Sequence, residues 1–165
     1  MSSSTFVVSH THTVTYITTK MLHLLSNIIR DIGLDPRRFA SDWNTYEDGL
    51  STWLASRHLQ RVTLEVHNPM ANKLVVRWDI EIVYSTVGDG TLWVDAEAVR
   101  YAIAKAGLVP SSCGYDVKVK NIPGAQTVAG WTDCTFLSTE GFNRYAVGAT
   151  VGGNGLTAQT AYWSR

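Results

Sequence analysis

The sequence is poor in cysteine, in surplus charge and in long apolar runs, and each shortage excludes a class of protein. Its two cysteines, Cys113 and Cys134, have no CxxC spacing, which excludes a Cys-rich zinc module and a disulfide framework. The formal net charge is zero, whereas direct nucleic-acid binding generally requires a surplus of Lys and Arg. No apolar run approaches the roughly 20 residues of a membrane span, and MSSSTFVVSH lacks the basic region and long apolar core of a signal peptide. We therefore expect a cytoplasmic protein with reduced thiols and no nucleic-acid or membrane partner.

Sequence signatures of catalysis and metal binding are missing as well. The chain has no Gly-x-Ser-x-Gly elbow, no GxxxxGK[ST] loop and no HExxH. His10 and His12 would share one face of a strand and could chelate a metal there, but on a helix they diverge by about 200°. Because helical periodicity begins near Thr13, we expect no metal site, no cofactor and no catalytic residue. A small metal-dependent hydrolase using the His10/His12 pair is the alternative hypothesis.

What the sequence does contain is the pattern of one folded domain with three helical regions. Its 165 residues are 45% apolar and 17% charged, as in folded single domains. Apolar residues at spacings of three and four over 14–32 predict a helix that Gly33 ends. A second helical stretch is expected over 37–57, with a possible break around Tyr46 to Gly49. AEAVRYAIAKA, capped by Asp95, predicts a third helix.

In three stretches, apolar and polar side chains alternate with the two-residue period of a strand. RVTLEVHN and KLVVRWDIEIVYS are separated by the turn NPMAN and predict an antiparallel hairpin, and YDVKVKN at 115–121 predicts a further strand. The hairpin has one apolar and one charged face, so helices should cover only one side. Asp79 and Glu81 could form a carboxylate pair, but Arg77 beside them, together with Arg61 and Glu65 across the hairpin, favours cross-strand ion pairing. We predict an α+β fold in which an antiparallel sheet carries three main helices on one face.

The C-terminal quarter differs in composition from the rest. Residues 124–165 hold seven of the thirteen glycines and only four Lys, Arg, Asp or Glu side chains, yet they include Trp131, Phe136, Phe142, Tyr145, Tyr162 and Trp163. Disordered tails are usually charged and poor in aromatics. A glycine-jointed aromatic segment can instead pack in more than one arrangement, since glycines act as hinges and aromatic rings bury area.

Five stretches, in this order of elements, resemble the HORMA domain family. They are HTVTYITTKML, GLDPRRFA, NPMANKLVVRWDIEIVY, VRYAIAKAGLVPS and GLTAQTAYWSR. The nearest likeness is to bacterial HORMA proteins encoded beside cyclic-oligonucleotide synthases in CBASS anti-phage operons, and it covers essentially the whole chain. It implies a single HORMA domain over 1–165, with an N-terminal handle at 1–12, a core at 13–121 and a C-terminal safety belt at 122–165, below called the belt.

The resemblance implies a peptide-binding adaptor that switches conformation, and not an enzyme. A closure-motif peptide would add a strand beside Tyr115–Asn121 and be covered by the belt, a mode in which main-chain bonds give affinity and side-chain pockets give specificity. The peptide-binding residues implied are Tyr115, Val117, Val119, Asn121, Trp131, Tyr162 and Trp163.

The resemblance also implies two protein partners. The peptide-bound form would bind and activate a cyclic-oligonucleotide synthase of the nucleotidyltransferase class in anti-phage defence. A ring-shaped AAA+ ATPase would reset the adaptor by pulling on the N-terminal handle, engaging Thr5, Phe6, Val7 and Val8. A HORMA-like scaffold that has lost peptide binding is a further alternative.

Overall fold

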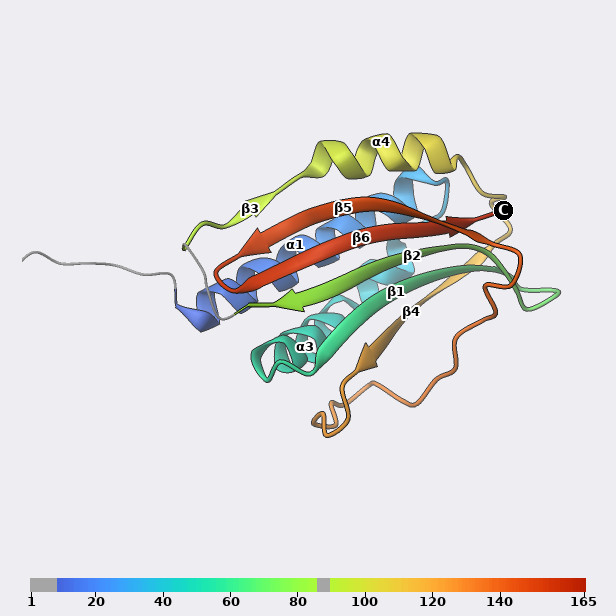
Figure 1. The fold of residues 1–165 in the computed structure, drawn as a ribbon. Coiled ribbons are helices and arrows are strands. Elements are labelled where there is room, and N and C mark those ends of the chain that lie inside the picture. Colours follow the sequence, from blue (N-terminus) through green and yellow to red (C-terminus); the bar gives the residue numbers. More distant parts are fainter. Residues whose placement is uncertain (1–8, 86–89) are drawn as a thin grey trace, which may run out of the picture.

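The computed structural model describes residues 9–85 and 90–165, which form a six-stranded sheet with helices on one face (Figure 1). The strand order is β3-β5-β6-β2-β1-β4, and all neighbours are antiparallel. The strands are β1 Leu59–Asn68, β2 Lys73–Tyr84, β3 Trp93–Val94, β4 Gly114–Asn121, β5 Asn143–Gly153 and β6 Leu156–Ser164. The helices are α1 His10–Asp31, α2 Arg37–Ser41, α3 Trp43–Ala55 and α4 Ala96–Ala106. The α+β fold expected from the sequence is confirmed.

Helix α1 forms the centre of the helical layer and begins at His10, earlier than the expected start near Thr13. Ser9 caps it, since its hydroxyl accepts a hydrogen bond from the backbone N–H of His12 at 3.1 Å. In the β-branched first turns, threonine hydroxyls find hydrogen-bond partners in the helix backbone: the Thr13 hydroxyl donates to the Ser9 carbonyl at 3.0 Å. Further along the helix, apolar side chains on one face are fully buried in the core. Both histidines of the suspected metal pair therefore lie in the first turn of a helix.

The second helical stretch is divided into α2 and α3, but the division falls at Asp42 and not at Tyr46–Gly49 as expected. Gly49 lies inside α3 and is buried. A Cβ atom at this position would lie 2.3 Å from Nε1 of Trp131. The glycine therefore leaves room for a distant side chain and does not break the helix, which the local sequence could not reveal.

The hairpin and the third helix form as expected. In the β1–β2 ladder Thr63 lies opposite Asp79 and Glu65 opposite Arg77. Asp95 caps α4, because its side chain accepts a hydrogen bond from the N–H of Ala98. Within the described residues no helix has both the length and the apolar character needed to cross a membrane.

The belt contributes to the fold in two ways. Residues 122–142, which we call the strap, run from the end of β4 to the start of β5 (Figure 1). The hairpin β5–β6 then turns at Asn154–Gly155 and joins the sheet through β6, which pairs with β2. Leu156 and Ala158 of β6 are buried in the common core. The C-terminal hairpin is thus part of the folded core, and it joins the sheet at the opposite side from β4.

Candidate functional site

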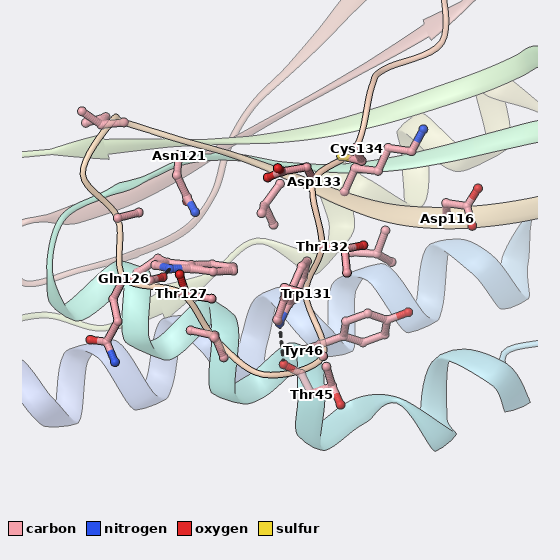
Figure 2. Close-up of a pocket in the computed structure, with 18 of the residues that line it drawn as sticks. Thr45, Tyr46, Asp116, Asn121, Gln126, Thr127, Trp131, Thr132, Asp133 and Cys134 are labelled. Carbon is pink, nitrogen blue, oxygen red and sulfur yellow. Dashed lines mark hydrogen bonds between the residues drawn. The ribbon is translucent and has the colours of Figure 1, made fainter.

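The open edge of β4, helix α3 and the strap together enclose a cavity of about 870 Å³, which we call the edge slot (Figure 2). Its lining comprises Asp42, Thr45, Tyr46 and Trp53 from the α3 region, residues 116–119 and 121 of β4, and residues 122–128 and 130–134 of the strap. Figure 2 shows the strap descending from the Asn121 end of β4 past Gln126 and returning through Trp131 to Cys134. The strap therefore forms a loop around the space beside the strand.

Strand β4 closes one end of the sheet order, and β1 is its only strand neighbour in the part of the chain described. Along an edge strand, backbone N–H and C=O groups of alternate residues point away from the sheet and can pair with another strand. The strand is also held firmly from behind. The Tyr115 hydroxyl donates to the carbonyl of Asp35 at 2.8 Å and accepts from the N–H of Phe39 at 3.1 Å. The site thus has a fixed strand with an open hydrogen-bonding edge.

Two tryptophans hold the strap against α3. The indole N–H of Trp53 donates to the carbonyl of Gln126 at 2.7 Å. The indole N–H of Trp131 donates to the carbonyl of Thr45 at 2.9 Å (Figure 2). The two indole rings meet edge to face, with centroids 5.1 Å apart. Trp53 thus holds the strap backbone and Trp131 anchors the strap to the backbone of α3, so both indole donors are used and the ring surfaces remain to face the slot.

Tyr46 adds a polar group to the aromatic wall of the slot. Its ring meets that of Trp131 at 5.9 Å. Burial, reinforced by the nearby carboxylate of Asp42, raises the pKa of Tyr46 to about 12. The hydroxyl therefore stays protonated at neutral pH and is available as a hydrogen-bond donor.

The strap crosses from the slot to the helix-free face of the sheet at a cluster that we call the clasp, formed by Glu65, Lys118 and residues 135–137. The fully buried Glu65 carboxylate accepts hydrogen bonds from Nζ of Lys118 at 2.5 Å and from the N–H of Leu137 at 2.8 Å. The same Lys118 ammonium donates to the carbonyl of Thr135 at 2.7 Å. The clasp thus joins the strap to both β1 and β4.

Beside the clasp, buried charges of β2 contact the belt. Arg77 donates to both carboxylate oxygens of Asp79, at 2.9 and 3.0 Å, and the indole N–H of Trp163 donates to the same carboxylate at 2.9 Å. The guanidinium groups of Arg61 and Arg77 lie over the ring of Phe136, at 4.7 and 5.7 Å from its centroid. The predicted ion pairing is only partly cross-strand, since Arg77 pairs within β2. Asp79 is a structural carboxylate held by Arg77.

The structure brings together four of the seven residues predicted to bind peptide. Val117, Val119, Asn121 and Trp131 line the edge slot. Tyr115 lies on the same strand, but its hydroxyl is bonded to the α2 region.

Tyr162 and Trp163 do not join this group, because β6 is separated from β4 by β2 and β1. Tyr162 packs against Trp78 and Tyr145, and Trp163 bonds Asp79. The aromatic rings of Tyr162 and Trp163 attach the belt to the sheet. Both residues belong to the same belt as Trp131, but they do not lie near the slot.

Several residues of the site were not singled out from the sequence. No sequence signal indicates that Trp53 and Glu65 contact the strap. The Asn154–Gly155 dipeptide, by contrast, is a strong hairpin signal. It would have placed β5 and β6 beside each other and shown that the C-terminal half of the belt is a hairpin.

The structure offers no support for a metal site in the residues it describes. No cluster of three or more His, Cys, Asp or Glu side chains suited to a metal ion occurs within 9–85 and 90–165. Nε2 of His10 lies 3.1 Å from the carbonyl oxygen of Ala55, so this ring contacts α3. The residues expected to engage an ATPase, Thr5, Phe6, Val7 and Val8, lie outside the described residues.

Comparisons with known proteins place the whole chain in one family and one fold. The family model described as Bacterial HORMA domain 2 matches residues 1–165. No curated protein matches the sequence. Among solved structures, C. elegans HTP-2 bound to the HIM-3 closure motif superposes with a TM-score of 0.75 at 13% identity, over 96% of this chain and 92% of that chain.

Two further structures show the same fold at similarly low identity. A chain of the mitotic checkpoint complex has a TM-score of 0.71 at 8% identity, over 92% of this chain and 98% of that chain. A chain of the E. coli MS115-1 HORMA:CdnC:Trip13 complex has a TM-score of 0.55 at 12% identity, over 98% of this chain and 96% of that chain. These likenesses concern the fold.

Proposed function

This chain belongs to the bacterial HORMA domain family, and on that premise we propose that it is a peptide-capturing adaptor. HORMA domains are binding proteins and not enzymes. In the proposed complex, an extended closure-motif peptide pairs with the open edge of β4 inside the edge slot, and the strap closes over it. The peptide-bound form then presents a surface to a protein partner.

One observation carries this proposal: an open strand edge lies inside a cavity that a loop of the same chain encloses. Addition of a strand to such an edge supplies main-chain hydrogen bonds, and the lining supplies side-chain contacts. At roughly 3.3 Å per residue, the eight residues of β4 can pair with a segment of comparable length. A scaffold without peptide binding would have no need of a strap that arches around this edge.

The placement of the C-terminal hairpin supports the same conclusion. Because β6 pairs with β2 at the other side of the sheet, the hairpin leaves the β4 edge free to receive a strand. The arrangement superposes on C. elegans HTP-2 bound to the HIM-3 closure motif. We take it as the conformation that holds a peptide.

For the partners, the proposal follows the E. coli MS115-1 complex of a HORMA protein with CdnC and Trip13. In the peptide-bound form, this chain would bind and activate a cyclic-oligonucleotide synthase of a CBASS anti-phage system in the cytoplasm. An AAA+ ATPase would reset it by pulling on the N-terminal handle.

Proline substitutions test strand addition at β4. Of the adjacent residues Asp116 and Val117, one N–H faces β1 and the other faces the open edge. Proline removes the N–H, so one of D116P and V117P should lower stability by weakening the β1–β4 ladder. The other should fold normally and lose capture of a peptide selected from a random display library.

Alanine at the same two positions is the matched control, because it alters the side chain and keeps the N–H. D116A and V117A should therefore capture the selected peptide. If the stably folded proline variant bound the peptide as well as its alanine control does, strand addition at β4 would be ruled out.

The partner proposal has its own test. The synthase encoded nearest this gene is assayed for nucleotide products with the chain alone and with the chain plus selected peptide. Product formation should require the peptide-loaded chain. Equal synthesis with and without the peptide would contradict the role as a switch while leaving peptide binding intact.

A further inference from the structure

We propose that the edge slot selects a cationic peptide whose side chains are apolar at every second position. This inference rests on the proposed function and deepens it by naming the class of peptide. It is carried by the charges that line the slot and by the aromatic wall on its helix side.

The charged lining of the slot is predominantly acidic. It contains three carboxylates, from Asp42, Asp116 and Asp133, and one ammonium group, from Lys118. The ammonium group is already bonded to the buried carboxylate of Glu65 and to a strap carbonyl. An acidic peptide would therefore find no unpaired cation in the lining.

The three lining carboxylates differ in their side-chain partners. Asp116 lies 3.2 Å from Nε2 of His67 and 3.6 Å from Nη2 of Arg38. Among the described residues, the side chains of Asp42 and Asp133 have neither an ion pair nor a hydrogen bond. They remain free to pair with a Lys or Arg side chain of a bound peptide.

Tyr46 and Asp42 both line the slot, and the Tyr46 hydroxyl, whose pKa is raised by burial and by the Asp42 carboxylate, adds a polar group to the lining. Lys120, the other cation of this part of β4, is exposed and is not part of the lining. The charge that a peptide meets inside the slot is therefore negative, which attracts a basic segment and repels an acidic one.

The helix side of the slot accepts apolar groups. Val117 and Val119 lie opposite Leu64 and Val62, which are buried in the core, so both valines face the helical layer. The rings of Trp53 and Trp131 lie on the same side, and both indole N–H groups are already bonded, that of Trp53 to the Gln126 carbonyl and that of Trp131 to the Thr45 carbonyl. Alternate side chains of an added strand point to this wall.

The pattern that fits the slot is thus an extended segment with apolar residues at alternate positions and Lys or Arg among the others. To test it, a library of random peptides is displayed and selected on the full chain. The enriched peptides should show apolar residues with period two and more Lys and Arg than Asp and Glu.

The possible results distinguish the class of peptide from peptide binding itself. Enrichment of acidic peptides, or of peptides without charge preference, would overturn this inference and leave the proposed function standing. Failure to enrich any peptide would contradict the proposed function, and this inference with it.

Charge removal inside the slot provides the second measurement. D42N and D133N should each weaken binding of an enriched basic peptide by about two- to fivefold, as partly exposed ion pairs do. D48N is the matched control, since Asp48 is an exposed carboxylate of α3 outside the lining. High salt should weaken the wild-type complex and have less effect on D42N/D133N. Equal affinity of all variants would overturn the inference.

Discussion

Glu65 of β1 and Leu137 of the strap are 72 residues apart in the sequence and are joined by a 2.8 Å hydrogen bond from the Leu137 N–H to the buried carboxylate. A buried carboxylate needs both a cation and hydrogen-bond donors. Here Lys118 supplies the cation and the strap supplies a donor. The sheet therefore holds the belt through the buried Glu65 carboxylate, which would lose one hydrogen-bond donor if the strap were absent.

Replacing this charge should loosen the strap. E65Q removes the partner of Lys118, and we expect the free energy of unfolding to fall by about 3 kcal/mol, as when a buried ion pair is broken. The N–H of Leu137 should also exchange faster with deuterium. E81Q is the control, because Glu81 shares this face of the sheet without contacting the strap, and it should change stability by less than about 0.5 kcal/mol. Similar effects of both substitutions would show that the clasp does not hold the strap.

Gly49→Ala should displace Trp131. The new Cβ would lie 2.3 Å from Nε1 of Trp131, so the ring must move and its bond to Thr45 is lost. We expect a loss of about 1–3 kcal/mol, as for other overpacked sites, with faster proteolysis of the strap. In a W131A background the same change should be neutral or slightly stabilising, since alanine is the better helix former. A double-mutant cycle from urea unfolding measures this difference, and additive effects would contradict it.

The two thiols should differ in reactivity. Burial raises the pKa of the Cys113 thiol, whereas Cys134 is exposed and lines the edge slot. Mildly alkaline iodoacetamide, followed by mass spectrometry, should therefore modify Cys134 first. In C113S, a bulky maleimide on Cys134 should also reduce capture of a selected peptide. Preferential labelling of Cys113 would contradict the arrangement of the strap.

Stability should decline in strongly alkaline solution. Burial raises the pKa of both Tyr46 and Tyr84 to about 12, from an ordinary value of 10.0. The folded state thus favours the protonated hydroxyls, so their contribution is fully present below the ordinary pKa and is lost as pH rises towards about 12. Urea midpoints should fall across this interval, and less steeply in Y46F/Y84F. An equally steep decline in that variant would assign the effect to other groups.

Substituting both suspected metal ligands should leave metal content unchanged. In H10A/H12A and in the wild type, elemental analysis of purified protein should find no stoichiometric transition metal, because the two rings start from different sides of the first turn of α1. The substitutions should also leave selected-peptide affinity unchanged. Stoichiometric zinc in the wild type that disappears in the variant would revive the metal-hydrolase hypothesis.

The periodicity of apolar residues in the sequence was sufficient to predict most of the individual helices and strands. Helix α4, the β1–β2 hairpin and β4 follow from local patterns of apolar residues and caps, because each buries one face of its own. The break at Asp42 was missed because Gly49 resembled a local helix breaker. Its actual role depends on Trp131, which lies far along the chain.

The candidate site was harder to predict than the fold. Resemblance to a family indicated the β4 edge and Trp131, and the structure places both at the slot. It did not separate the strap from the C-terminal hairpin, so it grouped Tyr162 and Trp163 with the residues of the slot, whereas both lie on β6, which β2 and β1 separate from β4. The clasp could not be predicted because Glu65 and Lys118 look like ordinary polar residues of half-exposed strands. In the folded protein Glu65 is fully buried and Lys118 is half-buried, and both bond to the strap.

The pairing of β6 with β2 has a topological consequence. The strap is covalently continuous with β4 at one end and with β5 at the other, and the ladders β5–β6, β6–β2, β2–β1 and β1–β4 join these ends across the sheet. Together they form a closed ring. A peptide beside β4 would pass through that ring and be surrounded by it. A motif at a free chain end could then slip out lengthwise, whereas one flanked by folded domains could leave only when the ring itself breaks.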